Sequence, residues 1–131
     1  MLNIPGLADA PFHCPPPEIV LDLPSPISVN RLWRKTKAGV IKSADYERWI
    51  KRADDLMLEM RQLRGVKTIT GQFTALIVCK RSNLDLDNNA KSVLDYLQRC
   101  RVIIDDSLCE ELTLRWGDAP TGARVTVRPC A

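Results

Sequence analysis

Two pairs of aspartates are the residues of this chain best suited to act together in chemistry. Asp85 and Asp87 lie two residues apart just before a segment with helical periodicity, and Asp105 and Asp106 follow directly after a short apolar run. Alternate residues on extended backbone point the same way, and carboxylates that end a buried run lie at the rim of a sheet. If the intervening helix packs back across the sheet, the second pair returns towards the first, and we expect one acidic cluster.

The predicted acidic cluster needs a cation to be stable. Carboxylates brought together in a protein repel one another unless a positive charge neutralises them. A shell of carboxylate oxygens without His or Cys suits Mg²⁺, with Mn²⁺ as a substitute, rather than zinc. An acidic N-cap of the following helix is an alternative explanation for Asp87, but it leaves Asp85 unexplained.

Lys91 is the basic residue that we expect beside this cluster. It follows Asp87 by one helical turn, so it projects on the same face of the helix. One interpretation is an i,i+4 salt bridge with Asp87. The other is a cation that, beside a bound metal, grips a scissile phosphate and stabilises the charge that builds on it in the transition state.

A calcium-binding EF-hand is a competing interpretation of the same stretch. Asp85, Asp87 and Asn89 match its first three ligand positions. However, Ala90 stands where the loop needs glycine for its tight turn, and Tyr96 stands where it needs a bidentate glutamate. The pattern therefore argues against an EF-hand.

The elements that position these residues follow from the periodicity of the apolar side chains. Alternation predicts a strand over 18–23, and an apolar run predicts a central strand over 72–80 that is covered on both faces. A helix is predicted from the N-cap Ser43 to about residue 64, closed by Gly65. A second helix is predicted over 87–99.

The rest of the chain completes a small α+β domain. We expect a polar loop over 28–37, a short edge strand over 39–42, and an apolar segment over 101–104 that leads to the second aspartate pair. Alternating segments at 108–116 and 123–128 are predicted to form a hairpin through 117–122. The fold class is therefore α+β, a single domain with a small mixed or antiparallel sheet and two helices.

Length and composition narrow the class of protein. The chain has 131 residues, 45% of them hydrophobic, and a net charge of +3, which fits one globular domain able to bind a polyanion. Its five cysteines are widely spaced without a CxxC pair, which favours free thiols. With no predicted signal peptide or membrane helix, we expect a cytoplasmic protein. Residues 1–17 predict a flexible Pro-rich arm, in which His13 and Cys14 lack the further ligands of a zinc site.

The stretch DLDNNAKSVLDYL followed by VIIDD resembles the core of the RusA family of Holliday-junction resolvases, in which a D-x-D-N-x-x-K block opens a helix and a second acidic block follows. The segment LPSPISVNRLWR is similar to that family's Pro- and Asn-rich segment. The resemblance covers residues 19–127, so it implies a RusA-like endonuclease domain within 18–131. Residues 1–17 are additional, and Ser82, Asn83 and Leu84 stand where several relatives carry arginines.

The resemblance implies a function and a set of site residues. Asp85, Asp87 and Asp106 would be metal-binding catalytic carboxylates, Lys91 the essential lysine, and Asp105 an accessory neighbour. The family cuts four-way DNA junctions with Mg²⁺ as a homodimer, in DNA recombination and repair, and two symmetric nicks suit a two-fold enzyme. The candidate DNA-binding residues are Asn30, Arg31, Trp33, Arg34, Lys35, Lys80 and Arg81.

Three points stay open at the level of sequence. Trp49 lies on the apolar stripe of the first helix and is expected in the core, whereas Trp33 fits either a DNA-facing platform or a dimer contact. A nuclease for flaps or other branched DNA would use identical chemistry. A non-catalytic DNA-binding dimer could keep the acidic cluster for structural reasons only.

Overall fold

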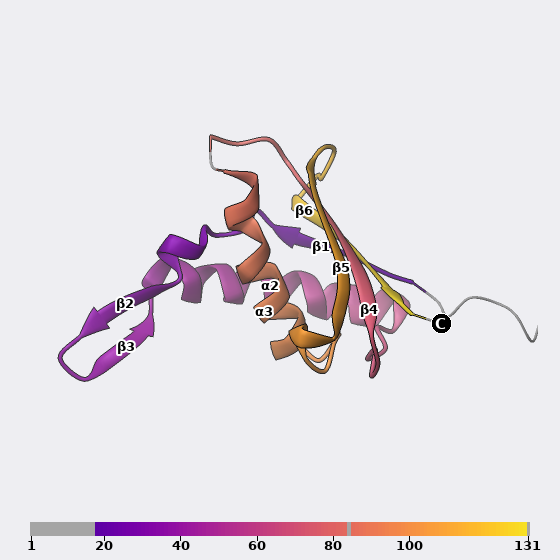
Figure 1. The fold of residues 1–131 in the computed structure, drawn as a ribbon, viewed down its shortest axis with the longest axis horizontal. Helices are drawn as coiled ribbons and strands as arrows, with labels where there is room; N and C mark the ends of the chain where they lie inside the picture. Colours follow the sequence, from indigo (N-terminus) through magenta and orange to yellow (C-terminus); the bar gives the residue numbers. More distant parts are fainter. Residues whose placement is uncertain (1–17, 84, 131) are drawn as a thin grey trace, which may run out of the picture.

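A computed structural model describes residues 18–83 and 85–130. The predicted Pro-rich arm, with His13 and Cys14, lies outside the described residues. In chain order the elements are β1 (Ile19–Pro24), the 3₁₀ helix η1 (Val29–Arg31), β2 (Trp33–Thr36), β3 (Gly39–Lys42), α2 (Ala44–Arg64), β4 (Phe73–Cys79), the 3₁₀ helix η2 (Leu86–Asn89), α3 (Ala90–Arg99), the 3₁₀ helix η3 (Asp106–Leu108), β5 (Cys109–Trp116) and β6 (Gly122–Pro129). Figure 1 shows their arrangement.

A mixed four-stranded sheet organises the domain. The strand order is β1-β6-β4-β5, in which β4 pairs antiparallel with β6 and parallel with β5, and β1 pairs antiparallel with β6. The central place of β4 agrees with its continuous apolar sequence. This sheet and the two α-helices of the described chain confirm the predicted single-domain α+β class.

The prediction of a hairpin between β5 and β6 is wrong, because β4 lies between these two strands. The connection 117–121 crosses the end of β4, where the Gly117 N–H donates to the Cys79 carbonyl at 2.9 Å and the Lys80 N–H donates to the Gly122 carbonyl at 2.9 Å. The alternation of side chains identifies the buried face of a strand but not the strand that pairs with it.

Helix α2 begins and ends where the sequence predicts. The Ser43 hydroxyl accepts a hydrogen bond from the Tyr46 N–H at 3.0 Å, and Gly65, at φ 68°, closes the helix by donating to the Arg61 carbonyl. The predicted apolar stripe is buried over most of its length, but Leu63 in the last turn is exposed. The buried members of the stripe are Tyr46, Trp49, Ile50, Ala53, Met57 and Met60.

Helix α3 connects the two parallel strands β4 and β5. The predicted helix 87–99 is a 3₁₀ turn followed by an α-helix that starts at Ala90. Val93 and Leu97 are buried, and so is Tyr96, whose hydroxyl donates to Asp54 at 2.7 Å. The Tyr96 ring also packs edge-on against Trp49 of α2, with ring centroids 5.4 Å apart. The two helices therefore share one core.

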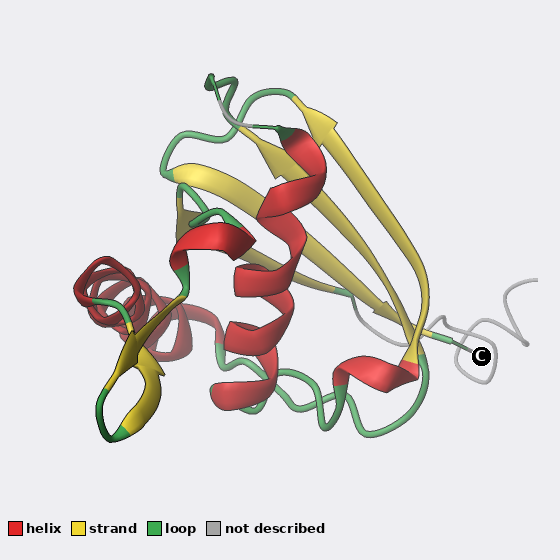
Figure 2. Cartoon of the chain, turned by 60° about the vertical axis from the view of Figure 1, so that its left-hand side comes forward, coloured by secondary structure: helices red, strands yellow, loops and turns green. Residues whose placement is uncertain are grey.

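Both helices pack on the same face of the sheet (Figure 2). The core side chains of β4 are Phe73, Ala75, Ile77 and Cys79. On the other face Val78 is buried, whereas Thr74 and Leu76 are only half-buried. The expectation that β4 is covered on both faces therefore holds only at Val78. Polar residues of the neighbouring strands keep the second face open to solvent.

The β2–β3 hairpin forms a sheet of its own. The segment 33–36, predicted as part of a loop, is the strand β2, which pairs antiparallel with β3. The predicted edge strand β3 therefore does not belong to the main sheet. Figure 1 shows the hairpin projecting from the body of the domain. Among the helices that the structure describes, none combines the length and apolar character needed to span a membrane.

Candidate active site

The first acidic block, Asp85 and Asp87, lies where the chain enters η2. Asp85 is the N-cap residue of η2 on extended backbone, but its side chain makes no capping hydrogen bond. Asp87 lies inside η2, and the N-cap residue of α3 is Asn89, so the explanation of Asp87 as a helix cap is wrong. Both carboxylates are exposed, and neither has a hydrogen bond or ion pair with another described residue.

Lys91, in the first turn of α3, connects this helix to the second acidic block. Its ammonium nitrogen lies 3.0 Å from Oδ1 of Asp95 and 3.8 Å from Oδ2 of Asp106. The i,i+4 partner of Lys91 is thus Asp95 rather than Asp87. The hydrogen bond and the charge of Asp95 are the main reasons why the pKa of Lys91 is raised, and Asp106 adds to the effect. Lys91 is therefore a fixed positive charge at neutral pH.

The second acidic block, Asp105 and Asp106, is held by the protein itself. Oδ1 of Asp105 accepts the Ser107 N–H at 2.9 Å, which caps η3 and lowers the pKa of Asp105. The N–H of Asp106 donates to Oε1 of Gln98 at 3.0 Å. Because Gln98 and Lys91 both belong to α3, this helix holds the second block at two points.

The expected convergence of the two acidic blocks is not found. Helix α3 does pack back across the sheet, but β4 and β5 are parallel, so the first block follows the end of β4 and the second precedes the start of β5. Within residues 18–83 and 85–130, no group of three or more His, Cys, Asp or Glu side chains is placed to hold a metal ion. Lys91 and Gln98 link the second block to α3, the helix that follows the first block.

The first block alone has a donor set that fits a metal ion. Mg²⁺ usually keeps several water molecules and binds proteins through one or two carboxylates, together with substrate phosphates. The carboxylates of Asp85 and Asp87 are exposed and unpaired among the described residues, so their oxygens are available for such an ion. Asp106 faces the Lys91 ammonium instead.

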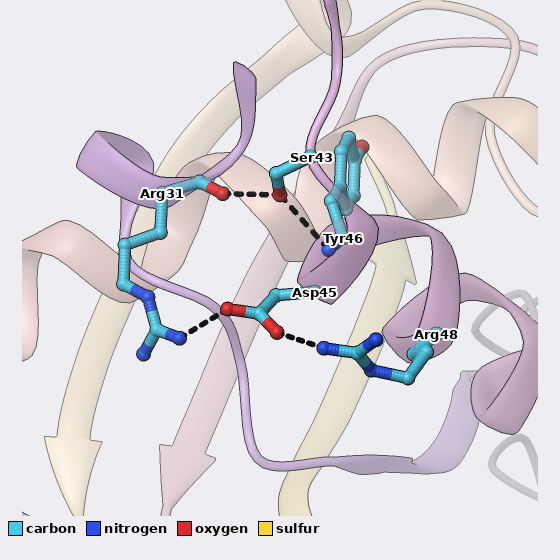
Figure 3. A network of polar contacts seen from close by, with 5 residues as sticks. All are labelled: Arg31, Ser43, Asp45, Tyr46 and Arg48. Carbon is cyan, nitrogen blue, oxygen red and sulfur yellow. Dashed lines mark hydrogen bonds and ion pairs between the residues drawn. The ribbon is translucent and has the colours of Figure 1, made fainter. Parts of the chain in front are cut away.

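The predicted DNA-binding residues Asn30 and Arg31 lie beside this region, because η1 packs against η2 and α3. Figure 3 shows how the segment is held: the Ser43 hydroxyl donates to the Arg31 carbonyl at 2.6 Å, and the Arg31 guanidinium pairs with Asp45, which also pairs with Arg48. These two arginines lower the pKa of Asp45. Asn30 and Arg31 are exposed.

The hairpin carries three more of the predicted DNA-binding residues. Trp33, Arg34 and Lys35 belong to β2 and are exposed, with 49% of Trp33 accessible to solvent. The Trp33 ring lies edge-on to Tyr46, with centroids 5.9 Å apart, and the Lys42 ammonium lies 5.6 Å from its centroid. The segment 33–42 contains no acidic residue. It is therefore a positively charged projection with an aromatic ring fixed at its base.

Lys80 and Arg81 lie just after β4, on the chain that leads to Asp85, and both are exposed. The Arg81 guanidinium lies 5.3 Å from the ring centroid of Trp116 at the end of β5. This contact orients Arg81, since a guanidinium stacks favourably on an indole ring. The structure thus places these two basic residues on the approach to the first acidic block.

Several side chains near the site were not found by sequence reasoning. Asp95 was overlooked although it follows Lys91 by four residues, a spacing that could have revealed the pair. Oδ1 of Asn89 is buried and lacks a hydrogen-bond partner within the described residues. Trp49, as predicted, is a core residue, and its indole N–H donates to the Ser25 carbonyl at 2.8 Å.

A groove of about 840 Å³ lies elsewhere in the described structure, lined by residues 18–20, 65–72 and 129–130. The acidic residues and Lys91 lie instead on an open surface. An open surface suits a long polymer whose phosphates are approached from outside, whereas small ligands are usually enclosed in a pocket.

No protein-family model matches the chain, and no curated protein matches it. The residue pattern and the geometry of the site are therefore the grounds for a function.

Proposed function

We propose that this protein is a Mg²⁺-dependent endonuclease that resolves four-way DNA junctions as a homodimer, as its resemblance to the RusA family implies. One observation carries the proposal. The exposed carboxylates of Asp85 and Asp87 have no partner among the described residues, and Asp87 precedes by four residues Lys91, whose ammonium is 3.8 Å from Asp106. The residue types of the family's acidic blocks and lysine are thus all present around one helix.

The surroundings of the acidic residues favour DNA as the substrate. The hairpin and η1 supply exposed basic side chains on one flank, and Lys80 and Arg81 supply them on the other. Phosphate contacts of this kind position DNA without reading its sequence. A metal ion bound by carboxylates could serve many reactions, but basic side chains on both flanks of the site favour a polyanionic substrate.

The proposed reaction is hydrolysis of a phosphodiester. A Mg²⁺ ion held by Asp85 and Asp87 would activate a water molecule and neutralise charge on the phosphate. Lys91 stays protonated and offers its charge to the non-bridging phosphate oxygens, while Asp95 and Asp106 keep its ammonium in place. Water adds to phosphorus, the bond to the 3′ oxygen breaks, and that oxygen takes up a proton. The products are a 5′-phosphate and a 3′-hydroxyl.

The alternative that has a structural observation in its favour is a non-catalytic DNA-binding dimer. Because Asp106 is engaged with Lys91, the acidic residues do not form one metal-binding group within the described chain. In this alternative, the sole role of the ion pairs of Lys91 is to hold η3 against α3. A flap nuclease is the third candidate, with the same chemistry and another DNA shape.

Cleavage assays on three DNA substrates of matched sequence separate these functions. A four-way junction, a flap and a linear duplex are incubated with the protein in Mg²⁺ and in EDTA. We expect paired nicks in the junction only, and only in Mg²⁺. Equal cleavage of all three DNAs would rule out junction selectivity, and tight binding without cleavage in Mg²⁺ or Mn²⁺ would support the non-catalytic dimer.

A further inference from the structure

The two outer edges of the main sheet differ in how they are protected. The edge strand β1 lies against α2, its Asp22 N–H points to the sulfur of Met60 at 3.4 Å, and the strand ends at Pro24. The other edge strand, β5, pairs only with β4 among the described residues, and Figure 2 shows its outer side without a covering element. An uncovered strand edge exposes backbone groups that can pair with another strand.

The sequence of β5 does not prevent such pairing. The strand has eight residues, CEELTLRW, without proline, glycine or lysine. Soluble proteins commonly protect a free edge with proline, lysine or a bulge. Leu112 lies in the middle of β5 with 37% of its surface exposed. The pairing of β5 with β4 has one irregularity, between Cys109 and Glu111, and is continuous from Glu111 to Trp116. This part of the edge is therefore regular and partly apolar.

We propose that β5 is the dimer interface, and that it pairs antiparallel with β5 of a second copy in a register centred on Thr113. In this register Glu111 lies opposite Arg115 of the partner subunit, and Leu112 lies opposite Leu114 of the partner subunit. The two-fold axis repeats both pairs. The two sheets thereby join into one continuous sheet, with opposite charges and apolar residues in matching positions.

The charges select this register over its neighbours. With a two-fold axis perpendicular to the sheet, each residue of β5 lies opposite a residue whose side chain is on the same face. The alternative registers are therefore those centred on another residue of β5. Centring on Leu112 places Glu111 opposite Thr113, and centring on Glu111 places two glutamates together. Centring on Leu114 leaves Glu111 without a basic partner.

The side chains of this pairing lie on suitable faces. Glu111, Thr113 and Arg115 line the shallow hollow on the open face of the sheet, beside Thr74 and Thr126. Leu114 and Trp116 on the opposite face already pack against the core, and the exposed Leu112 shares that face. Dimerisation would therefore extend the core across the edge and leave the charge pairs on the solvated side.

This inference rests on the proposed function in one respect, which is the requirement for two active sites that make two symmetric nicks. Because η3 leads directly into β5, the Asp106 residues of the two copies would lie at opposite ends of the paired strands. At about 3.3 Å per residue, these ends are on the order of 20 Å apart. Such an arrangement would give each copy its own site on either side of the two-fold axis.

The experiment is a charge exchange read by light scattering of the full-length protein without DNA or metal. Glu111→Arg and Arg115→Glu each place like charges opposite each other twice, so each should raise the dimer dissociation constant about tenfold or more. The double variant restores both pairs and should restore the dimer. Circular dichroism checks that every variant is folded.

Arg52→Glu is the matched control, because Arg52 is an exposed arginine of α2, the helix that lies against β1 at the other edge of the sheet. It should leave the dimer unchanged. An unaltered protein that is monomeric, or single exchanges that do not weaken the dimer, would overturn the inference. Since this measurement involves no cleavage, a β5 dimer that never cuts DNA would defeat the proposed function and leave the interface standing.

Discussion

Asp85 and Asp105 occupy the same kind of position and are treated differently by the fold. Each is the N-cap residue of a 3₁₀ helix, and each is the first aspartate of its acidic block. Asp105 caps its helix by accepting the Ser107 N–H, whereas Asp85 makes no capping bond. Asp105 therefore stabilises the fold locally, whereas the carboxylate of Asp85 makes no hydrogen bond or ion pair with another described residue.

The residues after these two N-caps differ in the same way. Asp106 is half-buried and faces the Lys91 ammonium, while Asp87 is exposed without a partner among the described residues. Carboxylates that do nothing for the fold are the ones whose loss should affect activity more than stability. On the proposed function, the contrast favours Asp85 and Asp87 as metal ligands and Asp106 as the residue that positions Lys91.

The largest effect is expected at Asp85. Asp85→Asn removes one of two carboxylate ligands, so we expect single-turnover junction cleavage in Mg²⁺ to fall about 100-fold or more. The melting temperature should not decrease, because the Asp85 carboxylate has no hydrogen bond or ion pair with another described residue. Asp105→Asn is the matched control, and it should cut within about threefold of the unaltered protein. Equal losses for both variants would remove the distinction between the blocks.

Replacement of Lys91 should cause the next largest loss of cleavage activity. Lys91→Gln removes the charge offered to the phosphate, and loss of one such group typically costs on the order of 100-fold in rate. Lys91→Arg should recover part of the activity. Because the pKa of Lys91 lies above its ordinary value of 10.5, its contribution should persist through neutral and mildly alkaline pH. A Lys91→Gln protein with normal single-turnover rates would show that the lysine only fastens η3.

Basic residues of the hairpin should affect binding rather than chemistry. Lys35→Ala removes one phosphate contact, so junction affinity should fall a fewfold and the slope of log affinity against log salt should decrease by about one. Lys67→Ala, in the loop ahead of β4, is the control. Fluorescence anisotropy across a salt series measures both. An unchanged salt slope for Lys35→Ala would exclude the hairpin from the DNA interface.

The smallest effect concerns stability and its dependence on pH. Asp105→Ala loses a cap and should lower the melting temperature by a few degrees at most, whereas Asp85→Ala should not. The lowered pKa of Asp105 stabilises the fold fully above the ordinary value of 3.8, and this stabilisation is lost as the pH falls through the folded-state pKa. The difference between the variants should therefore disappear in acid, as thermal melts at neutral and acidic pH would show.

The sequence predicts the elements of the fold better than their pairing. The helix that starts at Ser43 and ends at Gly65 is determined by local signals, and so is the buried face of β4. The prediction of a hairpin between β5 and β6 is wrong because strand pairing depends on contacts between residues that are far apart in the chain. Tyr96 was missed as a core residue because its partner Asp54 lies on the other helix, 42 residues earlier.

The candidate site shows the same limit. Sequence spacing identified the aspartate pairs and Lys91, because each lies within a few residues of an element boundary. It could not tell that β4 and β5 are parallel, so that the first pair follows the end of β4 and the second pair precedes the start of β5. Nor could it tell that Lys91 would contact Asp106 rather than Asp87, since that choice is made by the path of the chain after α3.

The central claim is that Asp85 and Asp87 bind the metal ion used for cutting DNA. Its most direct test is cleavage of a synthetic four-way junction by the unaltered protein and by Asp87→Asn, in Mg²⁺ and in EDTA, with junction binding measured in parallel. We predict paired nicks that require Mg²⁺ and are lost in Asp87→Asn, while the variant still binds the junction. Cleavage by Asp87→Asn at the unaltered rate, or cleavage that persists in EDTA, would contradict the claim.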